Sequence, residues 1–463
     1  MPRSDSLNSL KRLAEEARFF RADWPVTYRT AHACLDVLGA LNSDAGGTMA
    51  QMPLPTHVAA AVQPDDEPRL RIRSAQIAPP VGESEVVVPL AGDGAAPLGE
   101  KAAWAAGIVA LWPQVRQAGG GGASILIHSD IPQGAGQSSS TALLAAIALA
   151  LADQRQAPAP LAIAQRVAAA EALVAQGSAK RIATGPIIHA LTCLHPRGAR
   201  PQVLRYSAQP HRFVGPVPLP ESVRMLALDT GVRYATGHAG WSTGRGGGGM
   251  EEFRTAAAMG LRIVETIYRD LGQPHTPLHG YLANTSPLLY RQYFRPLLPR
   301  RMRAGDFVRA YGPLPELAAE SDDDKARLYR VRTAVDHLLS EHEHAEQFLQ
   351  AMEELAEAPP GHSAMDEAER QRTLQRAGRL LLASHHSYRL RLELSCREAD
   401  WLVDRLMEAG PDRGIYGARI TGTGGGGTVA ALLARTPVAT DAFLEVMKAY
   451  NHVTGLVLGV TEG

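Results

Sequence analysis

This chain has few cysteines, no formal net charge and no long apolar run. Its three cysteines, Cys34, Cys193 and Cys396, lie far apart with no CxxC pair, which excludes a disulfide scaffold and argues against structural zinc. Basic and acidic residues both number 47, so there is no general attraction to nucleic acid or to an anionic membrane. The longest apolar run, residues 141–152, is shorter than the roughly 20 residues that span a bilayer.

The remaining composition is that of an ordinary globular enzyme. At 463 residues, the chain is long enough for two or three domains of about 150 residues each. The first twenty residues contain no apolar signal core. We therefore expect a cytoplasmic protein of the α/β or α+β class, without a nucleic-acid or membrane partner.

Glycine is abundant, with 44 residues, and much of it lies in three runs, at residues 119–122, 244–249 and 422–427. The first two runs have the composition of loops or flexible linkers. The third separates two strand-like segments, residues 416–420 and 428–433, so it is predicted to be a tight connection within a sheet.

Local patterns predict several further elements. Strands are expected at 124–131 and 224–228, and helices at 139–153, 161–176 and 251–271. The proline-rich stretch at 215–220 is expected to interrupt regular structure and to mark a domain boundary. The acidic run at 321–325 is interpreted as a solvated loop.

The connection between the strand at 124–131 and the following helix has the chemistry of an anion site. A glycine turn, Gly134-Ala135-Gly136, leads into the helix N-terminus, where backbone N–H groups and the helix dipole favour a phosphate. Three hydroxyls, Ser138, Ser139 and Ser140, follow at the first helical turn and can cap the helix, bind phosphate oxygens or ligate Mg²⁺. The pattern matches neither the Walker loop nor the Rossmann fingerprint.

The PxGxGxSSS pattern that starts at Pro132 resembles the second signature of the GHMP kinases, the superfamily of galactokinase, homoserine kinase and mevalonate kinase. Residues 419–427 resemble the third signature, a glycine loop that packs against the nucleotide loop. Residues 35–39, with Gly46-Gly47 and residues 51–53, are similar to the first. The three signatures stand in the order and spacing of that superfamily.

The sugar-kinase branch, which includes L-arabinokinase and galactokinase, fits better than the isoprenoid branch. Further similarities lie at residues 229–233, 281–290 and 385–388. The resemblance runs from about residue 28 to residue 463.

The resemblance implies a two-domain α+β fold with the active site in the interdomain cleft. The domains would be a nucleotide-binding domain at 28–216 and a C-terminal domain at 217–463, preceded by a helical extension at 1–27. ATP and Mg²⁺ are the implied cofactors, and the acceptor is a small hydroxylated molecule such as a sugar. The matching nucleotide-binding positions are Pro132, Gly134, Gly136, Ser138, Ser139, Ser140, Gly424, Gly425 and Gly426.

The metal ligands of the family are a serine of the second signature and a glutamate on the following helix. Ser139, or its neighbour Ser140, and Glu171 stand at the matching places. Without the resemblance, Glu171 would be interpreted as a solvated helix residue.

The chain departs from the family pattern at the catalytic positions. Cys34 stands where the sugar kinases carry an arginine beside the catalytic centre, and no aspartate lies between Glu171 and Asp229, where they carry an acidic residue that orients or deprotonates the acceptor. The aspartate that helps hold the sugar is replaced by Ser43, with Asp44 adjacent. Asp36, Ser43 and Asp44 are our expected acceptor-binding residues.

Three explanations of these departures remain open. The chain is a kinase that works without a carboxylate base, which a loose phosphoryl-transfer transition state tolerates. Alternatively, it is a pseudokinase that binds nucleotide or ligand, or an enzyme with different chemistry on the same scaffold. His32, Cys34 and His189 are the candidate acids, bases or nucleophiles, although a buried cysteine or histidine is more often structural. Lys180 and Arg181 are candidates to replace the lost positive charge.

From these patterns we expect an ATP-dependent phosphotransferase, with His189, Asp44 and Cys34 as the candidate catalytic residues. The sequence specifies neither the acceptor nor the oligomeric state.

Overall fold

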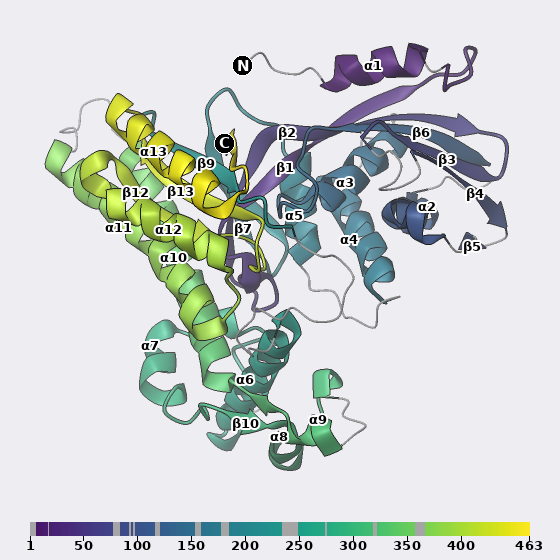
Figure 1. The fold of residues 1–463 in the computed structure, drawn as a ribbon. Coiled ribbons are helices and arrows are strands. Elements are labelled where there is room, and N and C mark those ends of the chain that lie inside the picture. Colours follow the sequence, from purple (N-terminus) through teal and green to yellow (C-terminus); the bar gives the residue numbers. More distant parts are fainter. Residues whose placement is uncertain are drawn as a thin grey trace. The chain divides into compact units, whose positions relative to one another are not determined.

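The computed structural model describes residues 6–16, 18–76, 84–91, 94–95, 98–115, 121–152, 159–176, 185–233, 249–273, 276–317, 322–356 and 366–463. The chain divides into two compact units, each made of several segments (Figure 1). Unit 1 consists of Met1–Leu35, Pro53–Gln133 and Gln137–Ala199, and unit 2 of Asp36–Met52, Gly134–Gly136 and Arg200–Gly463. Among the described residues, no helix is both long and apolar enough to cross a membrane.

Unit 1 is built on a β-sheet. The strand order is β5-β4-β3-β6-β2, and β1 pairs with β2. The β3–β6 pair is parallel, whereas β4 with β3 and β6 with β2 are antiparallel. The strands are β1 (Thr27–Leu38), β2 (Thr48–Asp65), β3 (Arg69–Ser74), β4 (Glu85–Ala91), β5 (Gly94–Ala95) and β6 (Gly122–Ser129).

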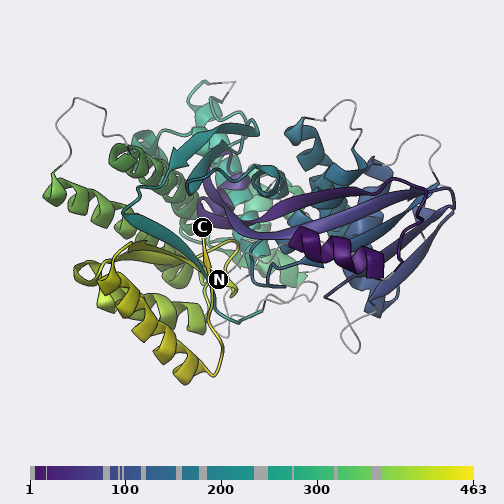
Figure 2. The same ribbon diagram turned by 90° about the horizontal axis from the view of Figure 1, so that it is seen from above.

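Helices cover both faces of this sheet (Figures 1 and 2). One face carries α2 (Ala106–Val115), α3 (Ser139–Leu151), α4 (Pro160–Gln176) and α5 (Gly185–Leu194), with a short turn, η2 (Glu100–Ala105), before α2. Because α3 contacts all three other helices of this layer, its alanine- and leucine-rich surface is buried almost all round.

The opposite face of the sheet carries α1 (Ser6–Glu16). Its apolar residues form a small core with the strands beneath. This core consists of Leu10, Ala14, Phe19, Ala59, Ala61 and Leu126. Helix α1 thus packs within unit 1.

Unit 2 contains an antiparallel sheet in the order β12-β13-β9-β14. Its strands are β9 (Val223–Asp229), β12 (Ile415–Ile420), β13 (Thr428–Ala434) and β14 (Gly459–Glu462). The first residues of β2 also belong to unit 2, where they pair with β7 (Gln202–Ser207), which pairs in turn with β8 (Arg212–Pro218). A two-stranded ribbon joins β10 (Met302–Arg303) and β11 (Leu328–Tyr329).

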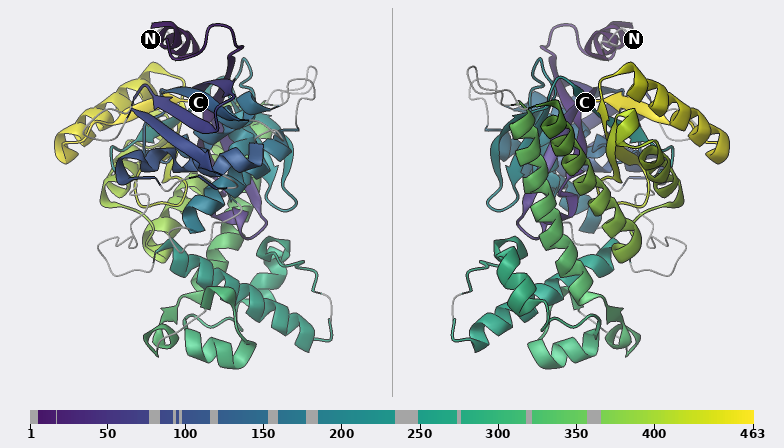
Figure 3. Two further views of the ribbon diagram at one scale, coloured as in Figure 1. Left: turned by 90° about the vertical axis from the view of Figure 1, so that its right-hand side faces the viewer. Right: turned by 90° about the vertical axis from the view of Figure 1, so that its left-hand side faces the viewer.

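The apolar core of unit 2 lies between its antiparallel sheet and its long helices. Two of these, α10 and α11, run side by side (Figure 3). The helices are α6 (Met250–Asp270), α7 (Pro287–Leu289), α8 (Ala304–Tyr311), α9 (Asp322–Ala326), α10 (Val331–Ala356), α11 (Glu367–His386), α12 (Arg397–Ala409) and α13 (Pro437–Thr454). Short helical turns are η1 (Ala40–Ser43), η3 (Leu282–Asn284), η4 (Tyr290–Phe294), η5 (Pro315–Leu317), η6 (Ser387–Leu392) and η7 (Pro411–Arg413).

The predicted helices and strands are confirmed, with ends that differ by at most two residues from β6, α3, α4, β9, α6, β12 and β13. Two local expectations were wrong. The acidic run forms the short helix α9 instead of a loop. The proline-rich stretch enters strand β8, because β8 is an edge strand that pairs only with β7 and an edge strand tolerates proline.

The boundary expected after residue 216 falls inside β8. The last boundary between the two compact units lies after residue 199, and β7 and β8 pair with the part of β2 that belongs to unit 2. The expected loop at 177–181, with Lys180 and Arg181, lies outside the described residues, as does most of the 244–249 run.

Candidate active site

The glycine loop before α3 has the backbone conformation of an anion-binding turn. Gly134, Gly136 and Ser138 have positive φ values of 67°, 75° and 59°, and such alternation turns successive N–H groups toward one side. Ser138 precedes the first residue of α3 without forming a side-chain cap, so the first N–H groups of that helix have no such partner. The loop therefore offers backbone donors to an anion.

The turn between β12 and β13 lies beside this loop within unit 2. This turn contains five glycines between residues 422 and 427, and all five have positive φ values, between 60° and 136°. Thr428 Oγ1 donates to the carbonyl of Ala135 at 2.7 Å. A Cβ added to Gly427 would lie 2.6 Å from the same oxygen. The expected packing of the third signature against the second is therefore present.

We expect Gly427→Ala to disturb the contact between the two loops, because the added Cβ would clash with the Ala135 oxygen in addition to straining the backbone. Gly427 has φ +77° and faces the Ala135 oxygen, whereas Gly455, at φ +68°, faces open space. Each alanine should cost about 1–2 kcal/mol of left-handed strain, but only Gly427→Ala should also displace the loop and weaken ATP binding. Thermal unfolding and ATP titration of both variants measure the difference. Equal losses of stability and unchanged ATP affinity would show that the close approach is unimportant.

Glu171 accepts hydrogen bonds from two hydroxyls of α3. Ser140 Oγ lies 3.2 Å and Thr141 Oγ1 2.9 Å from Glu171 Oε1. Burial raises the pKa of Glu171, and the hydrogen bond from Thr141, the charge of His189 and the hydrogen bond from Ser140 oppose that rise. Glu171 is therefore not the solvated residue that its sequence alone would indicate.

The structure brings Ser140, not Ser139, to the carboxylate of Glu171. Sequence reasoning also missed Thr141, which continues the run of hydroxyl residues into α3. The run of hydroxyl residues was the signal in the sequence. Which of these residues contact Glu171 depends on which side of α3 faces α4.

The oxygens around Glu171 suit a hard divalent cation. One carboxylate and two hydroxyls are the donor type that Mg²⁺ prefers, and Mg²⁺ sites usually take few protein ligands beside the phosphates of the substrate. Within the described ranges, no group of three or more His, Cys, Asp or Glu residues could hold a metal. The residues therefore fit a shared Mg²⁺–phosphate site better than a protein-only metal site.

His189 lies near this carboxylate. It is half-buried on α5, close enough for its charged form to lower the pKa of Glu171.

Two other candidates of unit 1 have the surroundings of structural residues. The side chain of Cys34 is buried, and its backbone N–H donates to the carbonyl of Gln137 at 3.1 Å. Burial, with a smaller contribution from His57, lowers the pKa of His32 to about 4, so its imidazole is neutral at physiological pH.

The first-signature residues lie in unit 2 and are held by polar contacts. Asp36 is buried and accepts a 2.6 Å hydrogen bond from Gln51 Nε2. A Cβ on Gly422 would lie 3.8 Å from Asp36 Oδ2, so Asp36 adjoins the third-signature turn. Ser43 is buried in η1, and Asp44 forms an ion pair with Arg254 at 3.2 Å.

A buried ion pair contacts the backbone of the first-signature segment. Glu341 Oε1 accepts from the N–H of Gly39 at 3.1 Å and lies 3.3 Å from Arg419 Nη1. The same Nη1 donates to the carbonyl of Val37 at 3.0 Å. Both charged side chains are almost completely buried. No sequence signal distinguishes Glu341 from the other acidic residues of α10.

Arg419 also connects this segment to the third-signature turn. Its guanidinium lies 5.1 Å from the ring centroid of Tyr388, and Tyr388 Oη donates to the carbonyl of Gly422 at 2.8 Å. Within unit 2, one network therefore holds the first- and third-signature backbones together.

Comparisons with known proteins agree with this arrangement. The family model of the GHMP kinases N-terminal domain matches residues 105–182, and that of the GHMP kinases C-terminal domain matches residues 364–452. The chain therefore contains segments that match both domains of the GHMP kinase family. The second signature falls within the first match, and the third within the second.

Two curated proteins with similar sequences are sugar kinases. L-arabinokinase of Arabidopsis thaliana is 25% identical over 377 residues, which cover 73% of this chain and 32% of the relative. Galactokinase of Chloroflexus aurantiacus is 27% identical over 329 residues, which cover 70% of this chain and 64% of the relative. The chain thus spans about a third of the first relative and just under two thirds of the second.

A solved structure has the same fold over nearly the whole length of this chain. Lactococcus lactis galactokinase, determined in complex with galactose, superposes with a TM-score of 0.68 at 16% sequence identity. The match covers 98% of this chain and 97% of that protein. The expected mixed α and β GHMP fold is confirmed.

Proposed function

We propose that this chain is a Mg-ATP-dependent phosphotransferase that phosphorylates a hydroxyl of a sugar or a sugar-like molecule. The observation that carries the proposal is the glycine loop at 134–136 with its positive φ values, followed by two hydroxyls bonded to a half-buried carboxylate. A chain without a use for a polyphosphate has no evident need for this combination. The sugar-kinase relatives support the class of acceptor.

In this proposal the N–H groups of the loop and Ser138 and Ser139 bind the triphosphate. The glycines at 424–426 close over its phosphates. Ser140, Thr141 and Glu171 are the side chains that would hold Mg²⁺, which when bound supplies charge neutralisation for the transferred group.

The acceptor side is proposed to include Asp36, Ser43 and Asp44. No aspartate lies between Glu171 and Asp229, so proton removal from the acceptor does not use the usual carboxylate. A loose transition state requires little assistance from a base, and positioning of the hydroxyl then becomes the main contribution of the protein. His189 is the candidate to receive the proton, although its position beside Glu171 also allows a purely electrostatic role.

A second candidate function is binding without catalysis. Cys34 in place of the family arginine and the missing aspartate favour it, because both changes remove charge from the catalytic centre and leave the nucleotide loop intact. Such a pseudokinase would bind Mg-ATP without turnover.

Incubation of the pure protein with Mg-ATP and a mixed pool of sugars, polyols and amino alcohols tests these alternatives. Mass spectrometry is expected to detect a new phosphorylated product, which also identifies the acceptor. Tight ATP binding without a product would favour the pseudokinase. The absence of both a phosphorylated product and ATP binding would contradict both proposals.

A further inference from the structure

Unit 2 contains a pocket apart from the glycine turns. One part lies between α10 and η4, and the other between α10 and the α11–η6 segment. The two parts share the lining residues Ser340 and Arg391. We call the combined space the Arg391 pocket.

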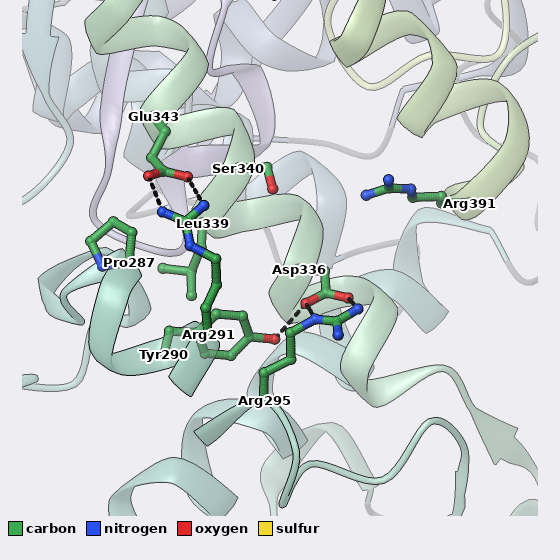
Figure 4. Close-up of a pocket in the computed structure, with 9 residues that line it drawn as sticks. All are labelled: Pro287, Tyr290, Arg291, Arg295, Asp336, Leu339, Ser340, Glu343 and Arg391. Atoms are coloured by element: carbon green, nitrogen blue, oxygen red, sulfur yellow. Dashed lines mark hydrogen bonds and ion pairs between the residues drawn. The ribbon is translucent and has the colours of Figure 1, made fainter. Parts of the chain in front are cut away.

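Two ion pairs form one wall of the Arg391 pocket (Figure 4). Arg291 binds Glu343 through both carboxylate oxygens, at 3.0 and 3.3 Å, and Arg295 binds Asp336 at 2.8 and 3.0 Å. The charges of these four groups cancel in pairs.

Arg391 contributes a charge that is not cancelled. Within the described residues, its guanidinium has neither a hydrogen bond nor an ion pair, and Arg330 donates to its backbone carbonyl. Figure 4 shows the guanidinium extending from η6 toward α10, with Ser340 between it and the Arg291–Glu343 pair. A free, exposed guanidinium beside a hydroxyl favours a carboxylate or phosphate group.

The inner wall carries buried polar atoms that lack hydrogen bonds. His337 and Glu341 are each 1% exposed, and among the described residues neither His337 Nε2 nor Glu341 Oε2 forms a hydrogen bond. Glu341 Oε2 lies 3.9 Å from His344 Nδ1, which is a long ion-pair contact. The other nitrogen, His337 Nδ1, bonds to Ser387 Oγ at 2.9 Å. Buried polar groups are normally satisfied, so these two atoms indicate an affinity for hydroxyl groups at this end of the pocket.

The charge of Glu341 does not prevent anion binding, because Arg419 balances it at 3.3 Å. Arg391 therefore determines the net charge of the lining. An anion without hydroxyl groups would pair with Arg391 but leave the polar atoms of His337 and Glu341 without hydrogen bonds. A neutral polyol would bind those atoms but leave Arg391 without a counter-charge. A ligand that satisfies both ends carries one anionic group and at least one hydroxyl.

We propose that the Arg391 pocket is a second ligand site, which binds a small hydroxylated anion such as a hydroxy acid or a polyol phosphate. Its anionic group binds Arg391 and Ser340, and its hydroxyl reaches His337 and Glu341. Because Glu341 also accepts from the N–H of Gly39, the ligand is connected to the first-signature segment. This proposal does not depend on the catalytic activity of the chain.

Isothermal titration of the full chain without nucleotide tests the site, with glycerate, glycerol 3-phosphate, inorganic phosphate and glycerol as separate probes. At least one of the two hydroxylated anions should bind saturably, and which one binds identifies the preferred anionic group. Phosphate and glycerol should bind about tenfold more weakly or not at all, because each lacks one set of contacts.

Arg391→Ala should weaken this binding by about tenfold or more, since a hydrogen bond to a charged group is lost. Arg405→Ala is the matched control, because Arg405 is an exposed arginine of α12 that pairs with Glu408 away from the pocket. Ser340→Ala is expected to weaken binding by a smaller factor.

Three results would overturn the proposal: no saturable binding of either hydroxylated anion, equal binding by the wild type and Arg391→Ala, or complete displacement of the probe by Mg-ATP. The last result would assign the anion to the nucleotide loop. A chain without kinase turnover would still show the Arg391-dependent binding, so the two proposals can fail separately.

Discussion

Replacing Glu341 by alanine is expected to destabilise unit 2 by about 3–5 kcal/mol, because the buried guanidinium of Arg419 then lacks a counter-charge. The two side chains are 1% and 0% exposed and lie 3.3 Å apart. The substitution also removes the acceptor of the Gly39 N–H. Urea unfolding followed by circular dichroism measures the change.

The pH dependence of stability gives a second test of the same ion pair. Burial alone would raise the pKa of Glu341, but Arg419, with His344 and His337, outweighs burial and holds this pKa well below its ordinary range. Such a carboxylate stabilises the fold above its unfolded pKa of about 4.3, and the contribution is lost as the pH falls toward the folded pKa. Below about pH 5, the wild type should therefore lose more stability than Glu341→Gln.

The double variant Glu341→Leu/Arg419→Met separates charge burial from positioning. Removal of both charges leaves no unpaired ion, so the double variant should recover most of the lost stability. The backbones of Val37 and Gly39 still lack their side-chain partners, so hydrogen exchange at residues 37–39 should be faster than in the wild type. A double variant as unstable as Glu341→Ala would contradict this explanation.

The second large effect is expected at Glu171, on function. Glu171→Gln should weaken Mg²⁺-dependent ATP binding by about 10–100-fold or more, because the amide removes the carboxylate from the oxygen cluster. Phosphoryl transfer should fall at least as much. Without ligands, the variant should be as stable as the wild type or more stable, because it no longer buries a carboxylate.

The pH dependence at Glu171 has the opposite sign from that at Glu341. Burial raises the pKa of Glu171, so ionisation of this carboxyl destabilises the fold as the pH rises from the unfolded pKa through the folded pKa. Metal binding requires the ionised form. Mg²⁺-dependent ATP binding by the wild type should therefore decline as the pH falls toward the raised pKa.

Glu67→Gln is a suitable control for Glu171→Gln, because Glu67 is an exposed glutamate of unit 1 that forms a surface ion pair with Arg69. It should alter neither ATP affinity nor its Mg²⁺ dependence. If Glu171→Gln binds Mg-ATP like the wild type, Glu171 is not a metal ligand.

The sequence alone predicted the features that depend on neighbouring residues. Glycine runs and hydroxyl residues identified the turns at 134–136 and 422–427, where positive φ values favour glycine. Apolar periodicity and helix-forming residues located α3, α4, α6, β9, β12 and β13. The three signatures, in order, indicated the family that the comparisons confirm.

The tertiary structure decided which distant side chains meet. Nothing near Glu341 in the sequence indicates that it binds Arg419 and Gly39, and nothing near Glu171 selects Ser140 and Thr141 over Ser139. Likewise, β8 tolerates its prolines only because it lies at a sheet edge. Turns and periodicity are set by local backbone preferences, whereas ion pairs and pockets depend on helix packing that brings together residues far apart in the chain.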